Sequence, residues 1–453
     1  MRIGVILFDD PQAISNGWSA VDGDSYAKRV RGAEDLASDT LWFTNLEFDH
    51  VRNSALSQNA YFRHHDYFGL KLSDLCAELG LTDAFSVTPD QLALKLVQLY
   101  SRFIDFECAL SGQSRDKWRA HPITARGSLR ENFWGIDQLG DDHLREAVDE
   151  SIQMYTSCDS RGFWDGYEHV KFYLPRLEHA RRILSMPVPL SNEYERVKRR
   201  PRKGEDISEW LMGQEGPVLA HTVIHSLDAD MSTVLNFGAA PPSKSIEEKG
   251  RLRTHTSTRQ WMTTLDLMTL NGFADLEIKE AIVFPRTMPL IRQPEIMRFF
   301  ELSEEIDALS YTVGIFATNL WTAMSRTHAR ASMRKHAMNA RVPFLRAVDR
   351  WECMKVAKVI MDMGYGVMGY GAGRVHARMP ELSLGDIAQV SLQTELMPPM
   401  LNTGGQGHEM FTERKPWDMM MKILTEGRSD EVMDADAMIV SDWLERRLRE
   451  SQN

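Results

Sequence analysis

Two short apolar runs near the start of the chain predict β-strands. The first is IGVILF at residues 3–8, which Asp9, Asp10 and Pro11 close. The second is TLWFTNLEF at 40–48, and a helix is expected before it at 25–36. Because Asp9 and Asp10 follow a buried strand, we expect these carboxylates at the crevice end of an α/β unit.

Most of the remaining chain shows apolar positions at the spacing of amphipathic helices. Pro89 suits the first turn of one such helix. One further strand is expected at 276–284, where Pro285 ends the run LEIKEAIVF. The expected helices cover 73–111, 141–154, 167–184, 219–235, 294–340 and 343–363. The pattern therefore predicts a mainly α (α+β) fold, a helical body with a few strands chiefly in the N-terminal 50 residues.

A charged stretch at 185–216 divides the chain. It combines several prolines with the basic cluster at 196–203, a composition typical of linkers. With 453 residues, the chain is long enough for two domains. The expected parts are an N-terminal α/β-to-helical domain at 1–190, a basic linker at 191–216 and a mainly helical domain at 217–453.

The composition is that of a globular protein outside membranes. Hydrophobic residues make up 43% and charged residues 26% of the chain, both ordinary values. No window approaches the roughly 18 apolar residues that span a bilayer, and the N-terminal run does not have the form of a signal peptide. The four cysteines are far apart and form no CxxC pair. Zinc ribbons and thioredoxin motifs are therefore disfavoured, and a reducing, cytoplasmic location is expected.

The basic segment at 326–378 stands out in an acidic chain. It carries eleven Lys and Arg and three Asp and Glu, a local charge of +8; since the whole chain has a formal net charge of -11, the remainder carries -19. The candidate phosphate-binding residues are Arg326, Arg330, Arg334, Arg341, Lys358 and Arg374. The first four recur at spacings of four, four and seven, which places them on one face of a helix. Such a stripe would follow phosphates; the alternative is a solvated helix surface.

A ladder of five glycines at 364–373 follows these helices. The string from Gly364 to Gly369 has the GxGxxG spacing of a dinucleotide-binding loop, but a helix precedes it where that motif needs a strand. A pliable turn that faces phosphate fits the ladder better. A purely structural turn is the alternative.

The stretch Lys358-Val-Ile-Met-Asp-Met-Gly-Tyr365-Gly366 resembles the fingers helix of single-subunit nucleic-acid polymerases, where a lysine precedes an apolar stretch and Tyr-Gly. The resemblance covers nine residues. The lysine and tyrosine are seven residues apart here, whereas that family has eight. The family's downstream His-Asp motif and a partner aspartate motif upstream are missing. We therefore assign no polymerase activity and transfer no catalytic residue.

Two histidines and an aspartate form a candidate metal site. On the helix expected at 219–235, His221 and His225 share a face, and Asp228 follows three residues later. Histidine with carboxylate suits Zn, Mn or Fe. Position 222 is Thr and not the glutamate of HExxH, which rules out that metalloprotease motif. The alternative is that the histidines pair with Asp228 or with backbone carbonyls.

A second polar group follows the strand expected at 40–48. Glu47 and Asp49 stand at its end, and His65 and Asp66 lie between aromatic pairs. Paired carboxylates bind Mg²⁺ in nucleases, whereas His and Asp hold the metal of HD-type phosphohydrolases. Asp49, His65 and Asp66 are therefore the candidate catalytic residues; a polar surface turn is the alternative.

These patterns favour an enzyme that acts on nucleic acid or nucleotides, such as a phage-type DNA-modifying transferase or a phosphodiester-processing enzyme. One alternative is a non-enzymatic DNA-binding or assembly protein. Another is a metal-dependent, HD-like phosphohydrolase. The expected partner is nucleic acid or nucleotide, and a divalent metal is the cofactor that the candidate sites would take. No GxSxG or Walker A motif is present, which disfavours serine hydrolases of that type and P-loop NTPases.

Overall fold

The computed structural model describes most of the chain up to residue 379. The described residues are 1–53, 62–64, 67–70, 75, 78–79, 88–125, 140–151, 156–157, 168–201, 205–228, 231, 234, 258–306, 309–325 and 339–379. They belong to two compact units. The first holds the described residues of Met1–Leu129 and Pro294–Phe316, and the second those of Arg130–Gln293 and Ala317–Pro399. Both boundaries predicted around the linker, at 190 and 216, fall inside the second unit.

A five-stranded mixed sheet forms the first unit, in the order β3-β2-β1-β4-β5. Its strands are β1 (Arg2–Phe8), β2 (Gly17–Val21), β3 (Lys28–Val30), β4 (Thr40–Thr44) and β5 (Phe62–His64). β4 runs parallel to β1 and β5, whereas β2 is antiparallel to β1 and β3. The strands predicted at 3–8 and 40–48 are confirmed. The helix predicted at 25–36 is wrong, because β3 and the 3-10 turn η1 (Ala33–Asp35) occupy that stretch.

Helix α3 (Pro89–Ser111) packs on β1 and β2. Pro89 lies in its first turn, where a missing N–H leaves no hydrogen bond unmade, and Gly112 ends the helix with a φ of 67°. Tyr100 stacks on Phe43 of β4 with ring centroids 4.0 Å apart, which joins the helix to the sheet. The other elements of this unit are α1 (Phe48–Asn53), η4 (Arg115–Lys117) and α9 (Pro294–Glu304).

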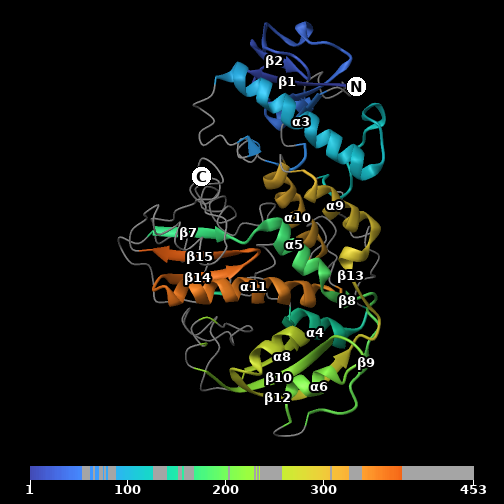
Figure 1. Cartoon of the computed structure of the whole chain (residues 1–453), viewed down its shortest axis with the longest axis vertical. Coiled ribbons are helices and arrows are strands. Elements are labelled where there is room, and N and C mark those ends of the chain that lie inside the picture. The colour runs from blue at the N-terminus through green and yellow to red at the C-terminus, as the bar shows by residue number, and fades with distance from the viewer. Residues whose placement is uncertain are drawn as a thin grey trace. The chain divides into compact units, whose positions relative to one another are not determined.

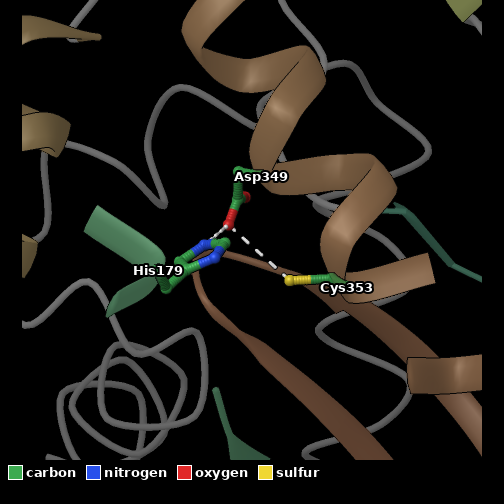
Figure 2. A group of neighbouring side chains, drawn as sticks. All are labelled: His179, Asp349 and Cys353. Atoms are coloured by element: carbon green, nitrogen blue, oxygen red, sulfur yellow. Dashed lines mark hydrogen bonds and ion pairs between the residues drawn. The ribbon is translucent and has the colours of Figure 1, made fainter. Parts of the chain in front are cut away.

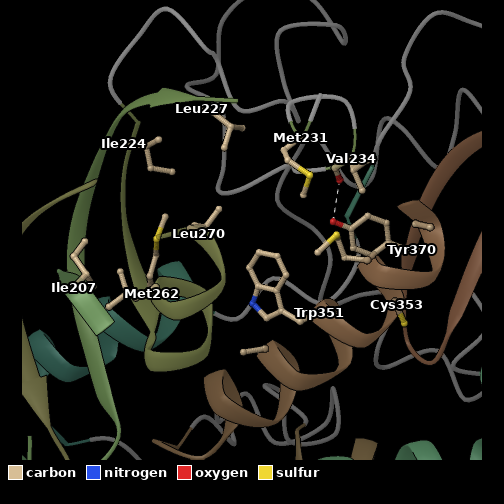
Figure 3. Packing of buried hydrophobic residues seen from close by; sticks show 14 of the residues in the cluster. Ile207, Ile224, Leu227, Met231, Val234, Met262, Leu270, Trp351, Cys353 and Tyr370 are labelled. Atoms are coloured by element: carbon tan, nitrogen blue, oxygen red, sulfur yellow. Dashed lines mark hydrogen bonds between the residues drawn. The ribbon is translucent and has the colours of Figure 1, made fainter. Parts of the chain in front are cut away.

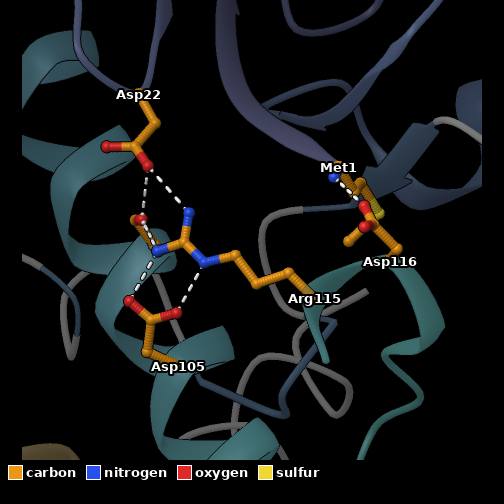
Figure 4. A network of polar contacts seen from close by, with 6 residues as sticks. Met1, Asp22, Asp105, Arg115 and Asp116 are labelled. Atoms are coloured by element: carbon orange, nitrogen blue, oxygen red, sulfur yellow. Dashed lines mark hydrogen bonds and ion pairs between the residues drawn. The ribbon is translucent and has the colours of Figure 1, made fainter. Parts of the chain in front are cut away.

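Arg115 ties η4 to α3 and to the end of β2 (Figure 4). Its guanidinium donates to Asp105 at 2.5 Å and to Asp22 at 2.9 Å. Burial alone would raise the pKa of Asp22, but hydrogen bonds from Arg115 and Ser101 lower it. The α-amino group of Met1 bonds Asp116 nearby. Because each of these charges has a partner within the unit, the network is structural.

The second unit contains two four-stranded antiparallel sheets and a two-stranded ribbon (Figure 1). The sheet orders are β11-β10-β12-β9 and β6-β14-β15-β7, and the ribbon is β13-β8. The strands are β6 (Thr156–Ser157), β7 (Glu168–Tyr173), β8 (Pro187–Pro189), β9 (Glu195–Arg196), β10 (Val218–Leu227), β11 (Thr258–Thr263), β12 (Ala274–Val283), β13 (Thr287–Pro289), β14 (Gly366–Gly371) and β15 (Arg374–Met379).

The remaining helices complete the described chain. They are α4 (Asp142–Ser151), α5 (Arg176–Ser185), α6 (Ile207–Met212), α8 (Thr264–Leu270), η5 (Leu290–Arg292), α10 (Ser310–Met324) and α11 (Val342–Asp362). Among the described residues, no helix has the length and apolar character needed to cross a membrane.

The prediction of a mainly helical body with strands chiefly in the first 50 residues is wrong. The described residues form a mixed α/β fold with sheets in both units. The strand predicted at 276–284 is confirmed by β12, but the helix predicted at 219–235 is largely strand β10, and the glycine ladder forms β14. An apolar run of this length does not distinguish a buried strand from a helix, and glycines within a strand resemble a turn.

Helix α11 lies along β14 and β15 and closes a core that both four-stranded sheets share (Figures 1 and 3). Trp351 and Met354 of α11 belong to this core together with Ile224 of β10 and Val375 of β15. Within this core, the Tyr370 hydroxyl donates to the Val234 carbonyl at 2.9 Å. The helix therefore holds the β14–β15 hairpin in a fixed position.

Candidate phosphate-binding site

The β15–β7 pair has one apolar face and one polar face. Its register pairs Arg374 with Tyr173 and Val375 with Phe172. Successive residues of a strand point to opposite faces. Val375 and Phe172 are buried in the core with α11, so Arg374, His376 and Tyr173 lie on the opposite face.

The described side chains that share the face of Arg374 come from β15 and β7 and not from β14. Among the described side chains of β15 and β7, those in phase with Arg374 are His376 and Tyr173. On β14, the residues opposite Arg374 and His376 are Gly371 and Gly369, which carry no side chains. The Arg374 guanidinium therefore lies beside buried β14 positions that carry no side chain.

Arg374 is buried without an acceptor for its charge. Its relative exposure is 0%, and Nε, Nη1 and Nη2 have no hydrogen-bond partner. Two buried arginines of α11 differ from it: Arg350 donates to Asp266 at 2.5 Å, and Arg346 donates to the Ser325 carbonyl at 2.8 and 3.1 Å. Removing an unpaired charge from water costs on the order of several kcal/mol. An anion beside Arg374 would offset that cost.

Asp349 of α11 fixes the turn that precedes Arg374 (Figure 2). Its two carboxylate oxygens accept the N–H groups of Ala372 and Gly373, both at 2.7 Å, and His179 Nε2 lies 2.7 Å from Oδ1. Ala372 and Gly373 have positive φ values of 55° and 73°, a conformation that glycine adopts without cost. The turn is thus held in place because its two successive backbone N–H groups bind the Asp349 carboxylate as an anion.

Cys353, one helical turn beyond Asp349, completes this buried cluster. Its thiol lies 3.6 Å from Asp349 Oδ1. Burial raises the pKa of Cys353 well above its ordinary value, and the charge of Asp349 adds to the effect. Cys353 is therefore a protonated core thiol and not a nucleophile.

The same cluster has the composition of a metal site. One ligand atom each from His179, Asp349 and Cys353 lies within 4.8 Å of the others, the one such group of three within the described ranges. Zinc accepts these ligand types. However, both Asp349 oxygens already accept backbone N–H bonds, so a metal ion would compete with the anchoring of the turn. The arrangement fits a hydrogen-bonded anchor better.

The predicted phosphate-binding residues are in different environments. Arg326, Arg330 and Arg334 lie outside the described residues. Arg341 is buried and donates to the Pro189 carbonyl at 3.0 Å, and burial lowers its pKa to about 10. Lys358 is partly exposed and pairs with Asp362. Among the described residues of this set, Arg374 is the one that is fully buried and whose side chain has no hydrogen-bond partner.

The predicted metal ligands lie on or next to β10 and not on a helix. His221 stacks on Trp261 with centroids 5.6 Å apart, and His225 Nε2 lies 3.0 Å from Glu277. The Asp228 carboxylate accepts from the Met231 N–H at 3.4 Å. Their role as metal ligands remains a prediction.

The predicted catalytic residues belong to the first unit. Asp49 lies exposed in α1, whereas His65 and Asp66 are outside the described residues. The parallel pairing of β1 and β4 brings the ends of these strands together, and Gln12 donates to Glu47 at 3.3 Å there. Asp9 pairs with Arg29. A catalytic role for Asp49, His65 and Asp66 remains a prediction.

No protein-family model matches the chain, and no curated protein matches its sequence. Among solved structures, it is similar to phi29 DNA polymerase complexed with primer-template DNA and incoming nucleotide, with a TM-score of 0.46 and 12% identity over 83% of this chain and 80% of that chain. It is also similar to phi29 DNA polymerase complexed with single-stranded DNA, with a TM-score of 0.43 and 11% identity over 86% of this chain and 82% of that chain.

Proposed function

We propose that the second unit binds nucleic acid through the phosphate backbone, and that Arg374 pairs with a phosphate. The observation that carries this proposal is the fully buried Arg374 guanidinium, whose three nitrogen atoms have no hydrogen-bond partner. A phosphodiester has the charge and the paired oxygens that match the planar guanidinium.

The strand positions around Arg374 favour a polyanion over a single small anion. His376 follows Arg374 along β15 in the same phase, and the β14 residues opposite these two are Gly369 and Gly371. A buried guanidinium next to glycines suits a chain of phosphates that approaches the backbone closely. Since the relative exposure of Arg374 is 0%, a phosphate reaches it only after a local rearrangement.

Binding of a fluorescent single-stranded oligonucleotide, measured by anisotropy over a range of salt concentrations, tests the proposal. Arg374→Met removes the charge at similar length, and we expect it to weaken binding at least about 30-fold, the effect of losing roughly 2 kcal/mol from a buried charged contact. The slope of log affinity against log salt should fall by about one.

Arg286→Ala provides the matched control. Arg286 belongs to the same unit, but its side chain is 76% exposed and lies 3.5 Å from Glu193. Its loss changes the net charge equally and should alter affinity by no more than about twofold, as expected for a screened surface charge. Absence of binding at low salt, or equal losses in both variants, would contradict the proposed function.

A further inference from the structure

We infer that the polar face of the β6-β14-β15-β7 sheet takes a metal-free phosphodiester, the backbone of a nucleic-acid strand, and not a magnesium-bound nucleoside triphosphate. This inference rests on the proposed function and names the chemical form of its ligand. It depends on which residue types the sheet places on each face.

The face that carries Arg374 has no carboxylate on any described strand of the sheet. The side chains in phase with Arg374 are Tyr173 and His376, and the facing positions on β14 are Gly369 and Gly371. Protein sites for Mg²⁺ are built from carboxylates together with substrate phosphates. The described side chains of this face do not supply the protein share of such a site.

Asp349 does not supply the missing carboxylate. Its oxygens accept the N–H groups of Ala372 and Gly373, and His179 Nε2 lies 2.7 Å from Oδ1. Turning it toward a metal ion would release two buried amides, each at a cost of about 1–3 kcal/mol. Both oxygens of Asp349 are therefore already used to hold the turn.

The charge of Arg374 acts directly against a metal ion. A divalent cation near a buried guanidinium meets like-charge repulsion that the low dielectric of the interior strengthens. A phosphate that already binds Mg²⁺ also has less negative charge to offer the guanidinium. A bare phosphodiester avoids both costs, so Mg²⁺ should compete with this site rather than assist it.

Oligonucleotide binding in excess EDTA and in Mg²⁺ at matched ionic strength tests the inference. We expect affinity in EDTA to equal or exceed affinity in Mg²⁺. Unlabelled oligonucleotide should displace the probe, whereas magnesium-bound nucleoside triphosphate at the same phosphate concentration should not.

The outcomes separate the two proposals. If EDTA abolishes binding that Mg²⁺ restores, and Arg374→Met also abolishes it, nucleic-acid binding stands and the metal-free ligand is wrong. The same holds if magnesium-bound triphosphate displaces the probe from the wild type. If no oligonucleotide binds in either condition, the proposed function itself fails.

Discussion

Glu107 of α3 should make the stability of the first unit depend on pH. Its side chain is 1% exposed. Oε2 accepts from the Trp118 indole at 2.7 Å, Oε1 accepts from the His121 N–H at 3.3 Å, and the Thr124 hydroxyl bonds Oε1. Burial raises the pKa of Glu107 to about 8, although the hydrogen bonds from Trp118 and His121 act to lower it. The folded protein therefore holds a neutral carboxylic acid here at pH 7.

The direction of this pH dependence follows from the number of protons that the folded and unfolded states bind. Below a pH of 4.5, the ordinary pKa of the group, Glu107 is protonated in both states. Between 4.5 and about 8 the folded state keeps the proton and the unfolded state does not, so stability falls as pH rises, by about 1.4 kcal/mol per pH unit. The full window corresponds to a loss of up to about 5 kcal/mol.

Glu107→Gln preserves the size and the acceptor for Trp118 but cannot ionise. We expect its unfolding free energy to lack the descent between pH 5 and 8 that the wild type shows, so that the variant is the more stable protein at pH 8. Denaturant unfolding at several pH values measures the pH dependence and the stability at pH 8. Hydrogen exchange of the α3 amides reports the stability of this unit in particular. Glu301→Gln is the control, because Glu301 is 52% exposed next to Arg298. Parallel pH curves for wild type and Glu107→Gln would refute the reasoning.

Further substitutions test buried contacts in both units. Asp349→Asn weakens the acceptor of two turn amides and should cost about 2–4 kcal/mol in denaturant unfolding; a loss under about 0.5 kcal/mol would contradict the anchor. Arg350→Ala leaves the buried Asp266 carboxylate without its ion-pair partner and should cost about 3–5 kcal/mol, part of which Asp266→Asn should restore in a double-mutant cycle. Gly4→Ala places a Cβ 2.5 Å from Trp42 and should lower the melting temperature through an overpacking cost of about 1–3 kcal/mol; an unchanged value would contradict the close contact.

The elements that the sequence predicts correctly are those with a clear period and clear ends. Strand β1 is a short apolar run closed by Asp9 and Asp10, and α3 combines Pro89 at its start with Gly112 at its end. Strand β14 could not be predicted in this way, because its glycines and Tyr370 gain a strand conformation only through pairing with β15 and packing under α11. That stabilisation is tertiary, and local sequence does not contain it.

The candidate site, like the fold, could be predicted from the sequence only in part. Charge alone places Arg374 among the phosphate-binding candidates, but its burial without an acceptor is a property of the fold. The His179–Asp349 pair spans 170 positions in sequence, so no spacing could indicate it. The i, i+4 placement of Asp349 and Cys353 on α11 was the available signal. His221 and His225 have even spacing, which gives a shared face in a strand as well as in a helix, and β10 has register shifts within this stretch.

The central claim is that the buried Arg374 guanidinium binds an anion. The most direct test is the unfolding free energy of wild type and Arg374→Met, with and without saturating oligonucleotide. Without ligand, we predict that the variant is the more stable protein by about 1–4 kcal/mol, because it no longer buries an unpaired charge. At a free oligonucleotide concentration near 100 Kd, the wild type should gain about 2.7 kcal/mol, and the variant should gain well under half of this. A variant that is less stable than the wild type without ligand, or that gains equally from the oligonucleotide, would contradict the claim.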